Sequence, residues 1–161
     1  MDIKVISPRL AVSPQIAPED VKSIAKAGYR AIICNRPDGE GADQPGFDDI
    51  AAAAKKAGLE TLYMPIVSGK VGDSDAAAFG AALDRLPGPV LAYCRTGTRS
   101  ATLWSLAMGA TLAPVEILAA TKAAGYDMNG VVRRIANGGK TPTTAADASY
   151  DVVIVGAGAG G

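Results

Sequence analysis

Short apolar runs alternate along most of this chain with longer segments whose apolar residues recur at helical spacing. Strands that are separated by helices form a mostly parallel sheet, because each helix returns the chain to the edge where the next strand begins. The pattern therefore predicts a three-layer α/β fold with helices on both faces of a central sheet. The expected strands are 3–6, 10–12, 29–34, 59–64 and 89–93, and the expected helices are 18–27, 47–57, 75–86, 100–110, 114–124 and 130–136.

The composition excludes several kinds of chemistry. The 161 residues carry no net charge and include no histidine. Without imidazole, Ser-His-Asp and Cys-His catalysis and histidine-ligated metal sites are excluded, and we expect no metal. A neutral chain gives no reason to expect a nucleic-acid partner. With two cysteines, no apolar stretch long enough to span a bilayer and no secretory signal pattern, the chain is expected to be cytoplasmic.

Cys94 stands at the point where an expected strand, 89–93, runs into an expected helix through the sequence Cys-Arg-Thr-Gly-Thr-Arg-Ser. Backbone N–H groups converge in such a loop and the helix dipole adds partial positive charge, so the loop favours a thiolate and binds anions. We predict that Cys94 is the nucleophile and that Arg99 is catalytic. The residues expected to bind the anion from this loop are Arg95, Thr96, Gly97, Thr98 and Ser100.

Sites in parallel sheets form where the strands end, which places loops 35–46 and 65–74 beside the Cys94 loop. Arg36 is predicted to bind the substrate anion and Asp38 to orient Arg99 or Arg95, although a weak salt bridge within the loop is the alternative. Asp73 is the candidate general acid and Asp75 a weaker one, since a carboxylate just before an expected helix also serves as a cap.

The end of the chain changes in character. Residues 139–149 are polar and read as a linker after a domain that spans 1–138. Residues 150–161 pair an apolar strand with the glycines of a dinucleotide-binding fingerprint, Gly156, Gly158 and Gly161. We expect this segment to be the incomplete start of an FAD or NAD(P) domain that cannot bind its cofactor here. A chance run of glycines is the alternative.

The Cys94 loop, the segment Leu-Ala-Val-Ser-Pro-Gln-Ile at 10–16 and the segment Cys-Asn-Arg-Pro-Asp-Gly-Glu at 34–40 resemble the phosphatase-like domain of beta-lactamase-hydrolase-like proteins over about residues 1–112. This resemblance implies a fold like that of dual-specificity phosphatases with a catalytic loop of rhodanese length. It also implies fusion to sulfur-handling partners, among them flavin disulfide oxidoreductases similar to sulfide:quinone oxidoreductase. In some dual-specificity phosphatases a cysteine placed like Cys34 pairs with the oxidised nucleophile, and a buried structural cysteine is the alternative.

The length of the loop separates two chemistries. Cysteine phosphatases use Cys-x5-Arg, in which the arginine clamps two oxygens of a phosphate. Here only four residues lie between Cys94 and Arg99, which is the rhodanese pattern, sized for one sulfur atom on the cysteine. The shorter loop disfavours phosphatase chemistry without excluding it.

Three functional hypotheses follow. The first is a sulfurtransferase in which Cys94 forms a persulfide while Arg95 and Arg99 bind an anionic sulfur donor, which a fused oxidoreductase supplies or consumes. The second is a tyrosine or dual-specificity phosphatase that forms a phosphocysteine at Cys94. The third is a non-catalytic regulatory module of the fused flavin oxidoreductase.

Overall fold

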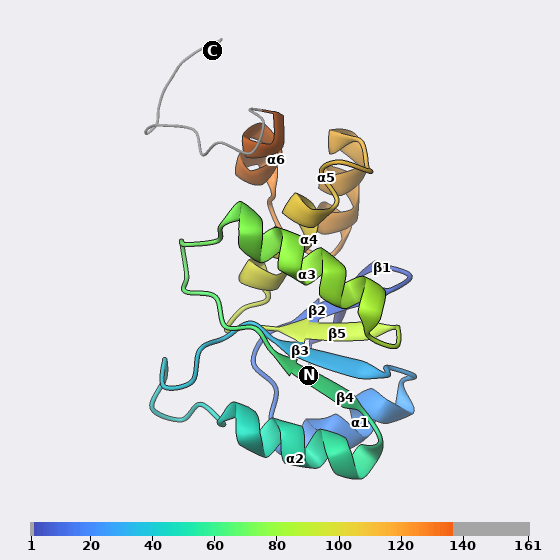
Figure 1. Ribbon diagram of the computed structural model, residues 1–161, viewed down its shortest axis with the longest axis vertical. Coiled ribbons are helices and arrows are strands. Elements are labelled where there is room, and N and C mark those ends of the chain that lie inside the picture. Colours follow the sequence, from blue (N-terminus) through green and yellow to red (C-terminus); the bar gives the residue numbers. More distant parts are fainter. Residues whose placement is uncertain (1, 137–161) are drawn as a thin grey trace.

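The computed structural model describes residues 2–136, which form one five-stranded sheet with helices on both faces (Figure 1). The sheet has the order β1-β2-β5-β3-β4. Only β1 is antiparallel to its neighbour. The strands are β1 (Lys4–Ser7), β2 (Leu10–Ser13), β3 (Ala31–Cys34), β4 (Glu60–Tyr63) and β5 (Val90–Tyr93). The predicted three-layer α/β fold is confirmed.

Residues 137–161 lie outside the described residues. The predicted linker at 139–149, the fingerprint glycines Gly156, Gly158 and Gly161, and the domain boundary at 138 all fall there. These assignments stay predictions. In the part of the chain that is described, no helix combines the length and the apolar character needed to cross a membrane.

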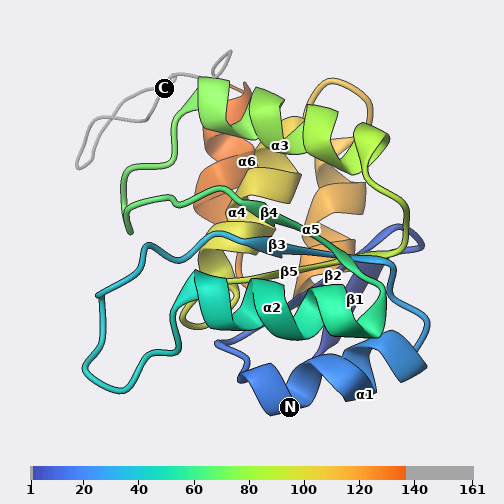
Figure 2. The same cartoon turned by 60° about the horizontal axis from the view of Figure 1, so that its bottom comes forward.

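The helices divide into two layers (Figure 2). The helices α1 (Val21–Lys26) and α2 (Phe47–Ala57) cover one face of the sheet. The helices α3 (Asp73–Arg85), α4 (Thr98–Ala107), α5 (Pro114–Ala123) and α6 (Asn129–Ala136) lie on the other. A short 3-10 turn at Pro18–Asp20 precedes α1, so the helix expected at 18–27 is split.

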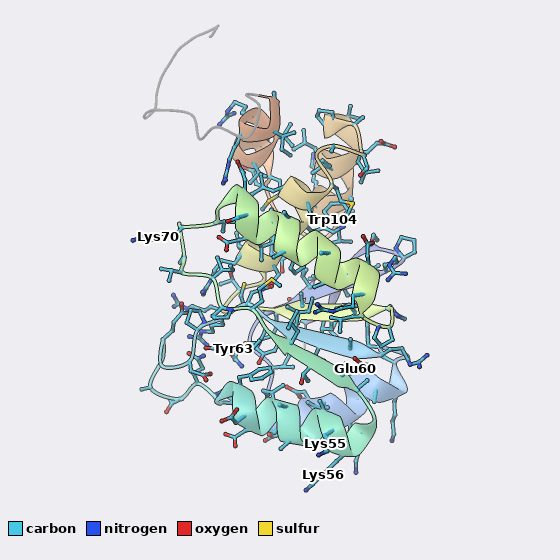
Figure 3. The ribbon with its side chains drawn as sticks, in the orientation of Figure 1. Lys55, Lys56, Glu60, Tyr63, Lys70 and Trp104 are labelled. Carbon is cyan, nitrogen blue, oxygen red and sulfur yellow. The ribbon has the colours of Figure 1, made fainter. Side chains whose placement is uncertain are left out.

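The core has two halves, one on each side of the sheet. Successive side chains of a strand point to opposite faces, so Ile32 packs under α1 and α2 while Ile33 packs under α3 and α4. All four residues are buried in each of β2, β3 and β5, as expected for parallel strands that are covered on both faces. Trp104 of α4 is 3% exposed and belongs to the half of the core that lies under α3 and α4 (Figure 3).

Two helices begin earlier than their apolar patterns predict. The expected start of α3 was residue 75, but the helix begins at Asp73 because the Asp75 carboxylate accepts the Gly72 N–H at 2.9 Å and caps the first turn. The expected start of α4 was residue 100, but Gly97 adopts a φ of 95° and the helix begins directly after it. As a result Arg99 already lies in the first turn of α4.

Candidate active site

Cys94 follows the last residue of β5, a central strand of the sheet, and its side chain is buried, with 1% of the residue exposed. The Gly97 N–H donates to its Sγ atom at 3.0 Å. Because α4 begins at Thr98, the N-terminus of that helix also faces the sulfur. Both features favour negative charge at this position, and the role of Cys94 as a nucleophilic thiolate stays a prediction.

Arg99 is held in one orientation by two groups from neighbouring loops. Its Nη1 and Nη2 atoms donate to the two carboxylate oxygens of Glu40 at 2.8 and 2.9 Å. Nη1 also donates to the Ile66 carbonyl at 2.8 Å. These bonds use three of the five N–H groups of the guanidinium. The Nε–H and the second Nη2–H form its side-on edge, which suits two oxygens of one oxyanion.

The environment of Arg99 keeps its charge. The hydrogen bond to Glu40 is the largest effect that raises the pKa of Arg99, and interaction with Cys94 raises it further, against the lowering caused by burial. The same bond from Arg99 is the largest cause of the lowered pKa of Glu40, and Arg36 adds to it. The result is a fixed cation beside the sulfur.

Arg36 lies on the other side of Glu40. Its Nε donates to Glu40 at 2.9 Å and its Nη1 donates to the Gln15 side chain at 3.1 Å. Arg36 and Arg99 are each only 8% exposed, so one carboxylate serves two nearly buried guanidinium groups. Arg36 therefore reaches the site as predicted, although Glu40 and Gln15 were not anticipated as its partners.

A pocket of about 770 Å³ opens above the Cys94 loop. Its walls come from the loops after β3, β4 and β5, the three loops that the sequence placed at the site, and from α4 and α6. Four arginines and one carboxylate contribute charged groups to the walls, so the pocket is suited to an anion. The lining residues are Arg36, Glu40, Gly41, Ser68, Gly69, Val71, Arg95, Thr96, Thr98, Arg99, Thr102 and Arg134.

Two predicted site residues have other contacts. The Asp38 carboxylate accepts the Phe47 N–H at 2.9 Å at the start of α2. Of the two arginines that Asp38 was predicted to orient, Arg99 is held by Glu40 instead, and for Arg95 the role stays a prediction. The Asp38 N–H donates to the hydroxyl of Tyr63, which lies at the end of β4 (Figure 3). Ser100 is fully buried and donates to the Asn35 side chain at 2.8 Å, tying α4 to the loop after β3 rather than facing the pocket.

Asp73 and Asp75 are separated by their contacts. Asp75 is the cap of α3, which confirms the capping alternative. Asp73 forms an ion pair with Arg134 of α6 at 2.7 Å, and Arg134 also donates to the Val71 carbonyl. Within residues 2–136, Arg134 lines the pocket and Asp73 does not. The predicted role of Asp73 as general acid stays a prediction.

Cys34 is a buried free thiol, as is Cys94. It pairs in register with Tyr93, the residue before Cys94, and donates to the Arg36 carbonyl at 3.2 Å. Burial is the main effect that raises the pKa of the Cys34 thiol. These features fit a structural cysteine, and a redox partnership with Cys94 stays a prediction. Within the described residues, no group of three or more His, Cys, Asp or Glu side chains could hold a metal ion.

A cysteine that meets a helix N-terminus and a fixed arginine at the carboxyl end of a central parallel strand is the arrangement of a phosphatase-like domain. Residues 2–113 match the phosphatase-like domain of beta-lactamase hydrolase-like protein, and the chain belongs to this family.

Known relatives place the domain within longer proteins and among phosphatase folds. The chain is 37% identical to a beta-lactamase hydrolase-like protein of Xylella fastidiosa over 134 residues, which are 82% of this chain and 31% of that protein. The chain thus spans less than a third of the length of this curated relative. A candidate phosphatase of Neisseria meningitidis matches with a TM-score of 0.77 and 34% identity, over 85% of this chain and 98% of that one. Tk-PTP in its active form matches in fold, with a TM-score of 0.67, 20% identity, and coverage of 86% and 95%.

The family and the Neisseria meningitidis structure favour the phosphatase hypothesis over the sulfurtransferase hypothesis. They do not show the predicted fusion to an FAD or NAD(P) oxidoreductase.

Proposed function

We propose that this domain hydrolyses phosphate monoesters through a phosphocysteine intermediate at Cys94. The observation that carries the proposal is the placement of the Cys94 sulfur between the Gly97 N–H and the Arg99 guanidinium. Glu40 holds this guanidinium through its Nη1 and Nη2 atoms. This placement supplies a nucleophile, a backbone donor and a cation to a single phosphate group.

The reaction has two steps. The Cys94 thiolate attacks phosphorus, the S–P bond forms, the P–O bond to the leaving group breaks, and the leaving oxygen takes a proton from a general acid or from water. Water then attacks phosphorus, the S–P bond breaks, and inorganic phosphate leaves while the water proton passes to the phosphate or to solvent. The side-on N–H groups of Arg99 bind the phosphate oxygens in both steps.

The charge and the size of the pocket support a class of substrate. Arg36 and Arg99 share Glu40 at the inner end, and Arg95 and Arg134 contribute further positive charge to the walls. A small phosphorylated molecule or a phosphorylated side chain fits this charge and a volume of about 770 Å³. The curated relative is longer than this chain, and the partner of this domain is predicted to be the oxidoreductase suggested by residues 150–161.

The role of Asp73 is tested by asking whether the effect of replacing it depends on the leaving group of the substrate. If Asp73 protonates the leaving oxygen, Asp73→Asn should lower kcat about a hundredfold for phenyl phosphate and much less for p-nitrophenyl phosphate, whose leaving group needs no proton. The matched control is Asp75→Ala, which should lower stability by about 1 kcal/mol through loss of its cap and leave the leaving-group dependence unchanged. If both substrates respond equally to Asp73→Asn, Asp73 is not the acid.

A second candidate function is transfer of sulfane sulfur, and the length of the loop favours it. Only Arg95, Thr96 and Gly97 lie between Cys94 and the first residue of α4. In this reaction the thiolate attacks the outer sulfur of thiosulfate, an S–S bond forms on Cys94, and sulfite leaves with the electron pair of the broken bond. An acceptor thiolate then takes the sulfur. No general acid is required.

One experiment separates the candidates. The full chain is incubated with p-nitrophenyl phosphate, or with thiosulfate and glutathione persulfide, and the reaction is quenched in acid. The mass of the Cys94 peptide is then measured by mass spectrometry. The proposed function predicts steady release of p-nitrophenol and an adduct heavier by one phosphoryl group. An adduct heavier by one sulfur atom, without phosphate release, would overturn it in favour of sulfur transfer. If neither adduct forms, the domain is a non-catalytic module.

A further inference from the structure

Tyr126 lies in the segment between α5 and α6, distant in sequence from the Cys94 loop. It is half-buried against the core, and its hydroxyl donates to the carbonyl of Thr96 at 3.1 Å. Thr96 is in the middle of the catalytic loop, so one side chain from the C-terminal helix pair holds the backbone of that loop.

The contact falls on the peptide group that serves the sulfur. The Thr96 carbonyl and the Gly97 N–H belong to one planar trans peptide, in which the C=O and N–H bonds point in opposite directions. Tyr126 holds the carbonyl end, and the N–H end donates to Cys94 Sγ at 3.0 Å. Rotating this peptide would break both bonds, so the Tyr126 bond keeps the N–H directed at Cys94.

Gly97 is shaped for the same contact. It has a φ of 95°, which side chains rarely adopt, and an added Cβ would overlap the Tyr126 hydroxyl. The Ser13 carbonyl, which also accepts the Cys94 N–H, lies on the same side at 3.4 Å from that position. Glycine therefore lets Tyr126 approach the peptide closely.

The tyrosine remains a donor at neutral pH. Burial raises the pKa of Tyr126, and the nearby Cys94 raises it further. The hydroxyl thus keeps its proton near neutral pH.

We propose that Tyr126 is a positioning residue, which fixes the Thr96–Gly97 peptide so that its N–H stabilises the Cys94 thiolate. The inference rests on Cys94 acting as the nucleophile, as in the proposed function. It holds equally whether Cys94 accepts a phosphoryl group or a sulfur atom. It extends the site beyond residues 2–113, the part of the chain that matches the family, to the segment between α5 and α6.

The test is the reactivity of Cys94 toward iodoacetamide as a function of pH, measured in the full chain by mass spectrometry of the Cys94 peptide. Tyr126→Phe keeps the ring and removes only the hydroxyl. We expect the pH of half-maximal alkylation to rise by about 0.5 to 1 unit, and the alkylation rate near neutral pH to fall about threefold to tenfold, the range that corresponds to one hydrogen bond. The matched control is Tyr29→Phe, on the opposite face of the sheet, which should leave the profile unchanged.

A second measurement follows the amide directly. The ¹⁵N–¹H signal of Gly97 should titrate together with Cys94 in the wild-type chain and respond more weakly in Tyr126→Phe. The proposal is overturned if the variant has the wild-type profile, or if it loses reactivity equally at every pH together with a lower Tm, which is the behaviour of a merely structural residue. Alkylation of Cys94 needs no substrate. The effect of Tyr126→Phe can therefore be measured even if the phosphatase assay fails.

Discussion

Replacing Cys94 with serine is expected to lower kcat for aryl phosphate hydrolysis by at least about a thousandfold, because a serine hydroxyl in this loop has no base to activate it and the chain contains no histidine. The sulfur is buried against the Gly97 N–H, and a hydroxyl occupies nearly the same space. The fold should therefore survive, with a Tm close to that of the wild type. Release of p-nitrophenol and thermal unfolding measure the two quantities.

The matched control is the other cysteine. Cys34→Ser changes a buried thiol whose partner is the Arg36 carbonyl, so it should cost stability and leave kcat within about threefold of the wild-type value. Loss of activity in both variants with equal loss of Tm would indicate a folding effect and would contradict the assignment of Cys94 as nucleophile.

The second large effect is expected from Glu40→Gln. The neutral amide leaves Arg36 and Arg99 without their shared carboxylate, and Arg99 loses the group that fixes its orientation. We expect kcat/KM to fall about 10- to 100-fold. Stability should fall by about 2 kcal/mol, less than for breaking a fully enclosed ion pair, because Glu40 lines an open pocket. Steady-state kinetics and urea unfolding measure the two effects. The control is Asp43→Asn, an exposed carboxylate of the same loop.

The stability difference between Glu40→Gln and the wild type should depend on pH. The hydrogen bond from Arg99 is the main effect that lowers the pKa of Glu40 in the folded chain. Stability from such a group is fully present above the pKa of the unfolded chain, about 4.3, and is lost as the pH falls through the lower folded value. The difference in the free energy of unfolding should therefore be largest near neutral pH and shrink below about pH 4. A difference that is constant with pH would contradict the ion-pair assignment.

Local signals in the sequence predicted most of the fold. The helix 47–57 has the expected bounds, because Gly58 adopts the left-handed conformation, with a φ of 80°, that ends it. The strands 10–12 and 89–93 were identified within one residue of β2 and β5, since their apolar runs are short and bounded by turn residues. The starts of α3 and α4 were missed by two residues. There a carboxylate at the third helical position and a glycine with positive φ determined the start, and neither shows in apolar spacing.

The sequence predicted the residues around the Cys94 sulfur, but not the residues that hold them in place. Cys94, Arg99 and Arg36 come together because each stands where a parallel strand ends or at the start of the helix that follows. Glu40 was missed because the path of an irregular loop is not encoded in periodicity. A carboxylate within the segment 34–40, close to a predicted anion-binding arginine, was the available signal. No sequence signal pointed to Tyr126, since only the packing of α6 on α4, and of α5 on α6 and β1, brings it to Thr96.

The burial of Ile117 in α5 and of Met128 just before α6 has a practical consequence. Both side chains belong to the same apolar core as α3 and α4. An expression fragment cut after residue 113 would expose that core to water and invite aggregation, whatever chemistry it retained. Soluble truncations should therefore keep the chain through Ala136.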